Sequence, residues 1–508
     1  MNDIFLKALV NLFIKIRPRR WMITCCAIML VLTILPIGLI GCNRTSPDEA
    51  DPPLSDVELP AVSGETPGSS GETPGADTDV PDWIPEPIKI NPLVVDPDQT
   101  GDLIIYLPPF SKFGLMIAID AYKEMYPNVN VIIETPSDTD SSVYSSRLST
   151  ELMAGTGPDI IFPRSMVDAE PGKLLNTDAF LDLNDLIESD DSFNLDDYVK
   201  AVLDGGLHNG KRYIMPYTYM VPIYSASTKT LNEIGFDMSQ STDLISFVNE
   251  AVRCLPKAQE NPNFRSLFDT FLWSDITRFF GISLVDFETG EILPDEDSIR
   301  ELFEAYKPYH HIDSDSSRTI QSKFAESLRN GARSFLLELA PHGFFERTSY
   351  LKGNGGFEML VIPGINGKTQ SRAWDTAAIR SGSPNTENAW NFIKLLLSPV
   401  TQSNVNITAV WLPVHKEVLI NKIEMDWYDY DGVVTTSTGD QFTCTRLSEA
   451  EMRAYMDAVL SVEDSLAYES HIIRSMLNDH IKPYFEGAVS LDATLSGLKS
   501  QLLLYLTE

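Results

Sequence analysis

Acidic side chains are the most numerous groups in this chain that could act as a general acid, base or nucleophile. The sequence holds 72 Asp and Glu residues against 39 Lys and Arg residues. Glycoside hydrolysis needs two carboxylates that face each other, and among so many acids any pair could be nominated. The sequence contains no Gly-x-Ser-x-Gly elbow, no His-Glu-x-x-His helix and no phosphate-binding loop. We therefore expect a protein that is not an enzyme.

Metal and redox chemistry have equally little support. The acidic segment Asp426–Asp431 lacks the alternating ligands and central glycine of a calcium loop, so we expect an exposed acidic turn there. No Cys/His cluster has the spacing of a zinc site. Cys254 and Cys444 are expected to be two separate buried thiols, with one disulfide as the alternative. We expect no metal and no cofactor.

Cys42 ends a segment with the features of an export signal. Three arginines between positions 17 and 20 precede an apolar run, 21–41, whose last residue is a glycine. The sequence Leu-Ile-Gly-Cys at this point resembles the bacterial lipobox, which implies cleavage before Cys42 and a diacylglycerol on its thiol. Two or more acyl chains hold a protein firmly at a membrane. The alternative is an uncleaved signal anchor, since about 20 apolar residues can span a bilayer. Both interpretations place 43–508 outside the cytoplasm.

The rest of the chain is strongly acidic. Without residues 1–41 it keeps 34 basic and 71 acidic residues, a net charge of −37. Such a surface repels nucleic acid and anionic headgroups, so neither is an expected partner. Residues 42–100 are predicted to form a disordered acidic tether, because they contain two near-copies, 63–69 and 70–76, and almost no large apolar side chains before position 81. Forty such residues span roughly 35 Å.

Beyond position 100 the apolar pattern alternates between strands and helices. Strand, helix, strand, helix, strand is typical of an α/β domain with a largely parallel sheet. Ligands bind beyond the carboxyl ends of such strands, which places Phe110 and Arg164 at a cleft edge. The strands are predicted at 103–107, 129–133, 159–162, 333–339 and 357–362, and the helices at 115–122, 147–153 and 387–397, the last capped by Ser383 with Pro384 at its first position.

Six short motifs in this order resemble the extracellular solute-binding proteins of bacterial ABC importers, in the sugar-binding branch that includes maltose-binding protein. The C-terminal segments look like those of clostridial-type members. The resemblance spans about 100–508. Its motifs are Gly155-Thr156-Gly157-Pro158-Asp159, Tyr213–Tyr217 with Ile223-Tyr224, Ala340–Phe344, Val361–Gly367, Ser383–Lys394 and Trp411-Leu412-Pro413-Val414.

The resemblance implies a two-lobe α/β fold of the periplasmic-binding-protein type II class, with three hinge crossovers and mixed sheets flanked by helices. It places the crossovers near 213–224, 340–344 and 374–379. The expected division is a signal peptide at 1–41, the tether at 42–100, lobe 1 at 101–218 and 340–376, and lobe 2 at 219–339 and 377–508 with the C-terminal helices.

Sugar binding needs flat apolar surfaces for pyranose rings and planar polar groups for hydroxyls, and closure must pair those polar groups. By its place in the family pattern, His342 stands where maltose-binding protein carries a stacking tryptophan, and Pro163-Arg164 departs from the family's aromatics. Each candidate could instead belong to the core or the hinge, and Trp390 is expected in the core. The predicted ligand-binding residues are Trp273, Trp374, Asp375, Phe110, Arg164, Tyr217, Tyr219, His342, Phe344 and Trp411.

The resemblance implies a monomeric lipoprotein on the outer face of the cell membrane that captures a solute and delivers it to an ABC permease. An oligosaccharide is the expected solute, with monosaccharide, polyol phosphate or peptide as alternatives. The same chain could serve as a solute sensor for a membrane kinase. An extracellular glycoside hydrolase is the less favoured alternative, because the family fold provides no catalytic centre.

Overall fold

The computed structural model describes most of the chain beyond the predicted tether. Cys42, Phe110, Arg164 and Trp273 lie outside the described residues. No helix within the described part of the chain is both long and apolar enough to cross a membrane. The described residues are 93–107, 112–134, 141–163, 171–177, 179–268, 279–311, 331–404, 408, 411–435, 441–468 and 470–507.

The first lobe is built on a five-stranded sheet with the order β2-β1-β3-β13-β6. β1 is parallel to β2 and β3, as the alternating pattern predicts, and β13 runs antiparallel to β3 and β6. The strands are β1 (Gly101–Tyr106), β2 (Val129–Glu134), β3 (Ile160–Ile161), β13 (Thr376–Ile379) and β6 (Met215–Pro216), and the helices around them include α3 (Lys112–Met125), α4 (Ser141–Met153), α5 (Pro171–Leu175) and α15 (Thr386–Leu397).

Asp159 explains why a Pro-Asp pair precedes β3. Its carboxylate is fully buried and accepts hydrogen bonds from the Ile104 amide at 2.7 Å and the Ser383 hydroxyl at 2.6 Å. Asn385 donates a third bond at 3.0 Å, and the Arg380 guanidinium lies 3.6 Å away. Ser383 is therefore a partner of Asp159, and the N-cap of α15 is Asn385 instead of the predicted Ser383.

The second lobe is built on a four-stranded sheet with the order β11-β8-β10-β9. Side chains alternate across it: Tyr224 and Phe335 pack toward α9, while Ile223 and Leu336 belong to the other core, which contains α14 residues. The elements are β8 (Ile223–Ser227), β9 (Ser266–Phe268), β10 (Arg333–Glu338), β11 (Phe357–Val361), α8 (Thr228–Ile234), α9 (Leu244–Ala258), α11 (Glu296–Tyr306) and α14 (Pro341–Gly353).

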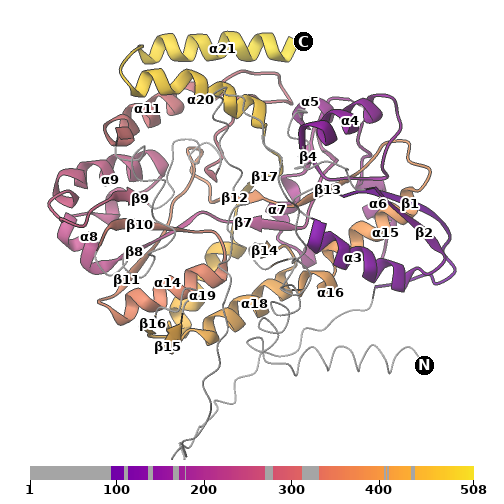
Figure 1. Ribbon diagram of the computed structural model, residues 1–508, viewed down its shortest axis with the longest axis horizontal. Coiled ribbons are helices and arrows are strands. Elements are labelled where there is room, and N and C mark those ends of the chain that lie inside the picture. The colour runs from indigo at the N-terminus through magenta and orange to yellow at the C-terminus, as the bar shows by residue number, and fades with distance from the viewer. Residues whose placement is uncertain are drawn as a thin grey trace, which may run out of the picture. The chain divides into compact units, whose positions relative to one another are not determined.

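A third sheet joins the two lobes and is called the hinge sheet here. Its order is β14-β7-β12-β17, with β14 (Leu412–Pro413), β7 (Thr218–Met220), β12 (Gln370–Ala373) and β17 (Asp464–Leu466). β7 connects β6 to β8, β12 connects β11 to β13, and β14 leads from the first-lobe helix α15 toward α18 (Lys416–Asp429). All three crossings therefore lie side by side, in the middle of Figure 1. The predicted two-lobe α/β fold with three crossovers is confirmed.

The positions of the second and third crossings differ from the prediction. Residues 340–376 were assigned to lobe 1 and 377–508 to lobe 2, but β11 still pairs with β8 in the second lobe. The chain returns through β12 to β13, and α15 then packs on β1 and α3 of the first lobe. The third crossing is β14. Ala340, which the resemblance placed at the second crossover, is the N-cap of a helix within the second lobe, with Pro341 at its first position.

The C-terminal region is mainly helical, as expected, with one hairpin. Asp426–Asp429 belongs to the last turn of α18 and Tyr430 is buried, so the predicted acidic turn is wrong. Cys254 and Cys444 are free and buried, as predicted.

The C-terminal elements are α18 (Lys416–Asp429), β15 (Gly432–Thr435), β16 (Gln441–Cys444), α19 (Glu449–Leu460), α20 (His471–Phe485) and α21 (Leu491–Thr507). The shorter elements elsewhere in the described chain are α6 (Asn184–Ser189), η2 (Leu195–Asp197), α7 (Lys200–Asp204), β4 (Leu207–His208), β5 (Lys211–Arg212), η3 (Met238–Gln240), η4 (Lys307–Tyr309) and α16 (Pro399–Gln402).

Candidate ligand-binding site

Polar side chains gather at the carboxyl ends of β1 and β2, the edge where α/β sheets bind ligands. Arg147 of α4 donates to the Tyr106 hydroxyl at 2.8 Å and to the Glu134 carboxylate at 2.7 Å. Burial, with the nearby Glu151 carboxylate, raises the pKa of Tyr106 to about 12, so its hydroxyl stays protonated. At this edge, a hydroxyl and a carboxylate thus both accept hydrogen bonds from one guanidinium.

Thr218 and Asp375 tie the first crossing to the second. The Thr218 hydroxyl donates to the Asp375 carboxylate at 2.8 Å and accepts from the Asp375 amide at 3.0 Å. The backbone repeats the connection, since the Trp374 amide donates to the Thr218 carbonyl at 2.9 Å. These bonds hold the Asp375 side chain, which is half-buried, at a fixed place between the lobes.

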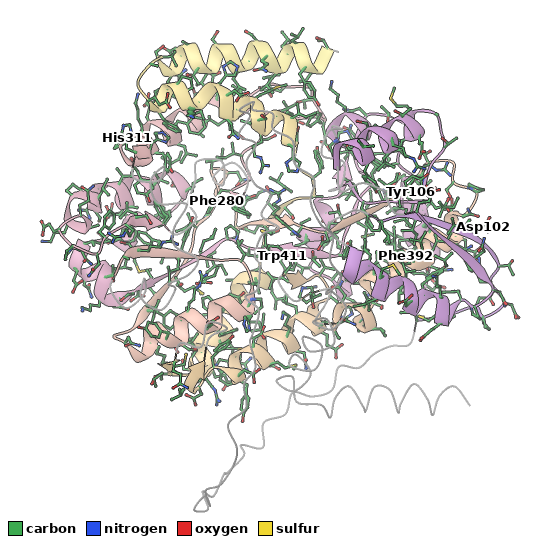
Figure 2. All side chains as sticks on the ribbon, viewed as in Figure 1. Asp102, Tyr106, Phe280, His311, Phe392 and Trp411 are labelled. Carbon is green, nitrogen blue, oxygen red and sulfur yellow. The ribbon has the colours of Figure 1, made fainter. Side chains whose placement is uncertain are left out.

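An aromatic pair stands next to these bonds. The rings of Trp374 and Trp411 are 4.5 Å apart between centroids and inclined at 40°. Trp374 is buried, whereas Trp411 from the third crossing is partly exposed. The Arg372 guanidinium lies 5.6 Å from the Trp374 ring centroid. An indole face beside a guanidinium and a carboxylate can bind the apolar face and the hydroxyls of a sugar. Figure 2 shows Trp411 between Phe280 of the second lobe and Tyr106 of the first.

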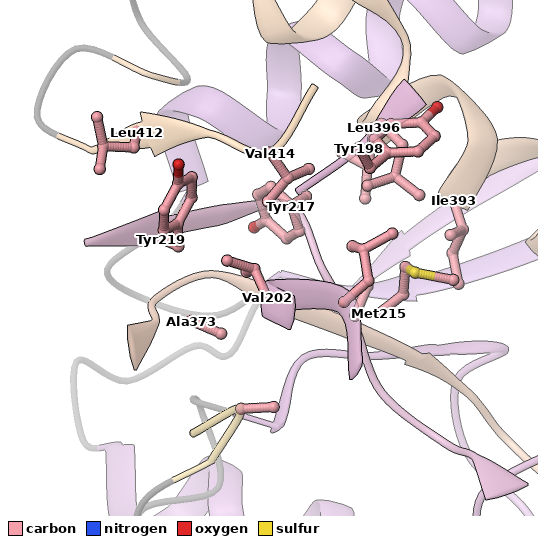
Figure 3. Close-up of a cluster of buried hydrophobic side chains, with 14 of the residues drawn as sticks. Tyr198, Val202, Met215, Tyr217, Tyr219, Ala373, Ile393, Leu396, Leu412 and Val414 are labelled. Carbon is pink, nitrogen blue, oxygen red and sulfur yellow. The ribbon is translucent and has the colours of Figure 1, made fainter. Parts of the chain in front are cut away.

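The two hinge tyrosines, Tyr217 and Tyr219, are both buried, unlike the partly exposed Trp411. Tyr219 has no exposed surface, and its hydroxyl donates to the Val459 carbonyl at 2.8 Å, so the structure gives its predicted contact with ligand no support. Burial raises the pKa of Tyr219 far above its usual value. Tyr217 retains 4% of its surface, and its contact with ligand stays a prediction. Figure 3 shows both rings within an apolar cluster with Leu412 and Val414.

Two predicted residues belong to α14 and lie inside the second lobe. Phe344 is fully buried and stacks on Tyr455 with 4.1 Å between ring centroids, so the structure gives its predicted contact with ligand no support. His342 is exposed and its ring is hydrogen-bonded to the Tyr430 hydroxyl at 2.8 Å. The chain does not cross between the lobes at 340–344, so His342 does not lie at a crossover, and its contact with ligand stays a prediction.

The structure thus brings together Trp374, Asp375 and Trp411, while Trp273, Phe110 and Arg164 remain predictions outside the described residues. Arg372 and Thr218 were missed by sequence reasoning, because they lie on two strands, β12 and β7, whose pairing the sequence does not reveal. No group of three or more potential metal ligands occurs among the described residues.

Comparisons with known proteins place this geometry in a family. The model of the bacterial extracellular solute-binding proteins matches residues 114–403, more than half of the chain. No curated protein sequence matches. An extracellular solute-binding protein family 1 member from Alicyclobacillus acidocaldarius aligns with a TM-score of 0.53 at 13% identity, covering 81% of this chain and 100% of the other. The ABC substrate-binding protein Lmo0181 from Listeria monocytogenes, solved in complex with cycloalternan, aligns with a TM-score of 0.51 at 13% identity, covering 80% and 100%.

At such low identity the two structures support the shared fold alone, and the family assignment comes from the match to the family model. The order of strands, the three adjacent crossings and this match agree with one another. The chain belongs to the bacterial extracellular solute-binding protein family.

Proposed function

We propose that this protein is the substrate-binding lipoprotein of an ABC importer and that it captures a carbohydrate between its two lobes. The observation that carries the proposal is the hinge sheet, in which β14, β7 and β12 place all three crossings side by side. A rotation confined to a few residues of these strands can close the lobes without repacking either core.

The chemistry of the hinge supports a carbohydrate. Trp411 offers a partly exposed indole beside Trp374, and Asp375 and Arg372 supply planar acceptors and donors. The structural relative from Listeria monocytogenes was solved with cycloalternan, an oligosaccharide. Closure of the lobes buries these polar groups. Because an unpaired buried group costs about 1–3 kcal/mol, a solute with matching hydroxyls favours the closed state over one without them.

The N-terminal segment supplies the location. Cleavage before Cys42 and acylation of its thiol anchor the protein at the outer face of the membrane, and the acidic tether lets the folded lobes reach solute. The closed form then docks on the permease. A lipoprotein that senses the same solute for a membrane kinase would bind ligand identically and differ only in its membrane partner.

A thermal-shift screen of the full chain against linear and cyclic oligosaccharides tests the proposal. Monosaccharides, polyol phosphates and short peptides serve as the contrasting classes. We expect one oligosaccharide class to raise the melting temperature, because a ligand bound only by the folded state stabilises it by about 2.7 kcal/mol at one hundred times Kd. A shift with peptides alone would replace carbohydrate as the solute, and turnover of any bound glycan would contradict the binding role.

A further inference from the structure

The two lobes touch at a second place, separate from the hinge sheet. The first-lobe side consists of Gly172, Lys173 and Asn176, at α5, and of Asn209 in the turn between β4 and β5. The second-lobe side consists of Phe287 and Glu288 in the turn 285–292, which the bridge between Val285 and Ile292 closes, and of Tyr505 on α21. We call these seven residues the interlobe contact.

The centre of the interlobe contact is the packing of Phe287 on Gly172. A Cβ atom at position 172 would lie 2.5 Å from two carbons of the Phe287 ring, so the ring rests directly on the glycine backbone. Gly172 is buried, and Phe287 also packs against the second-lobe core and the Tyr468 ring. Only glycine permits this approach, although the first turn of a helix ordinarily accepts any side chain.

Hydrogen bonds surround this packing. The Asn176 amide group donates to the Phe287 carbonyl at 2.8 Å, and its oxygen pairs with the buried His208 ring at 2.8 Å. The backbone amide of Asn209 donates to the Glu288 carboxylate at 2.6 Å. These bonds are specific in direction, so they fix the register between the turn 285–292 and the first lobe.

The C-terminal helix adds a third point. Lys173 donates to the Tyr505 carbonyl, and its ammonium group lies 3.9 Å from the centroid of the Tyr505 ring. α21 is itself fixed to the second lobe, where Lys499 pairs with Glu296 and Arg300 with Asp492 at 2.6 Å. Lys173 therefore connects α5 to a helix that belongs to the other lobe, and Figure 1 shows α5 and α21 on the same side of the hinge sheet.

The place of α5 along the chain relates the interlobe contact to the ligand-binding edge expected for the first-lobe sheet. α5 is the first described element after β3, so it follows the carboxyl end of that strand, where ligands bind in this class of sheet. We propose that the interlobe contact stabilises the closed arrangement of the lobes, with the packing of Phe287 on Gly172 as its main part. The proposal rests on the proposed function only in assuming that the lobes open and close. Loss of the contact shifts the population toward the open state. The apparent affinity for solute then falls in proportion to the fraction of molecules that remain closed.

The test compares Gly172→Ala with Gly343→Ala in the unliganded full chain. Both glycines stand in the first turn of a helix, and a Cβ at 343 meets nothing closer than 3.4 Å. In Gly172→Ala we expect backbone amides of 207–212 and 285–292 to exchange hydrogen about tenfold faster, with β1 and β8 unchanged. Unchanged exchange, or faster exchange throughout both lobes, overturns the proposal.

A distance measurement tests the motion itself. Spin labels are attached to two introduced cysteines, Val143→Cys on α4 and Met238→Cys on η3, both at exposed positions. Double electron–electron resonance then measures the distance between the two labels, which reports the separation of the lobes. Cys25, Cys26 and Cys42 are replaced by serine. We expect a longer mean distance in Gly172→Ala than in Gly343→Ala, and equal distances contradict the proposal. Neither measurement needs a ligand, so a failed glycan screen and a failed interlobe contact are separate results.

Discussion

The side chain of Gln402 donates a hydrogen bond from Nε2 to the backbone carbonyl of Tyr217 at 2.8 Å. Its Oε1 accepts from the Val414 amide at 2.9 Å, and Nε2 also donates to the Leu396 carbonyl at 2.9 Å. Gln402 has no exposed surface. One buried amide therefore joins the residues that enter the first crossing to those that leave the third, and it fixes the distance between two hinge strands.

Replacement of Gln402 by leucine should destabilise the fold. The Tyr217 carbonyl and the Val414 amide would lose a partner inside the protein, and each unpaired buried group costs about 1–3 kcal/mol. We expect a loss of about 2–4 kcal/mol in the free energy of unfolding, measured by urea denaturation. Gln240→Leu, at an exposed position of η3, is the matched control and should change little. Equal effects of the two substitutions would contradict the role of Gln402.

Asp159→Ala should have a larger effect. The substitution removes the acceptor for the Ile104 amide and the Ser383 hydroxyl and leaves the Arg380 guanidinium without its buried carboxylate. Breaking such a buried network costs about 3–5 kcal/mol. Urea denaturation measures the change, with Asp191→Ala in an exposed turn as the control. A loss below about 1 kcal/mol would mean that the Pro-Asp motif does not support the first lobe.

The sequence predicts local elements better than it predicts the route of the chain. The structure contains the strand predicted at 103–107 and the helices predicted at 115–122 and 387–397, since each is determined by neighbouring residues. The second crossing was misplaced because Ala340–Phe344 resembles a family motif for that crossing. Only the distant pairing of Met359 with Ser225 shows that the chain is still in the second lobe.

The same limit applies to the site. Trp374 and Asp375 could be nominated because the resemblance places this ring and carboxylate at a crossover between the lobes. Gln402 could not, since a single glutamine in a short helix gives no signal until β7 and β14 are known to be neighbours. Phe344 shows the opposite case: an aromatic side chain beside a predicted crossing lies in the core and stacks on Tyr455.

Asp190 should make the stability of the first lobe depend on pH. Burial favours the neutral acid, but hydrogen bonds from Lys394, Ser192 and Trp390 outweigh it and hold the pKa of Asp190 well below its usual value. A depressed folded-state pKa stabilises the fold above the unfolded pKa of about 4, and this stabilisation is lost as the pH falls toward the folded value.

We therefore expect Asp190→Asn to destabilise the protein by about 1–2 kcal/mol at pH 7 and by less below pH 4. Urea denaturation at both pH values measures the difference. The exposed Asp191→Asn variant should show the same pH dependence as the original protein. A constant difference between Asp190→Asn and the original chain across this range would exclude the carboxylate as its cause.

Cys42→Ala should release the protein from the membrane if the proposed lipobox is processed. Without the thiol no diacylglycerol can be attached, and a chain without acyl groups has no firm hold on a bilayer. We expect the original protein to enter the detergent phase on partitioning and the variant to lack the mass of the lipid. Cys26→Ala, which alters a cysteine within the apolar run, should remain lipidated. Membrane attachment of both variants would favour the uncleaved signal anchor.

Trp411→Ala should separate ligand binding from stability. Trp411 is partly exposed, so its loss removes little from the core, but it removes the accessible face of the pair with Trp374. For the glycan found in the screen we expect Kd to rise about tenfold, equivalent to about 1.4 kcal/mol, with a small change in melting temperature. Phe344→Leu is the contrasting variant: because Phe344 is fully buried, it should lower the melting temperature by several degrees and leave Kd unchanged. If Trp411→Ala bound the glycan as tightly as the original protein, the sugar would not stack at the third crossing, and the site would have to lie farther along the edge that Tyr106 and Glu134 form.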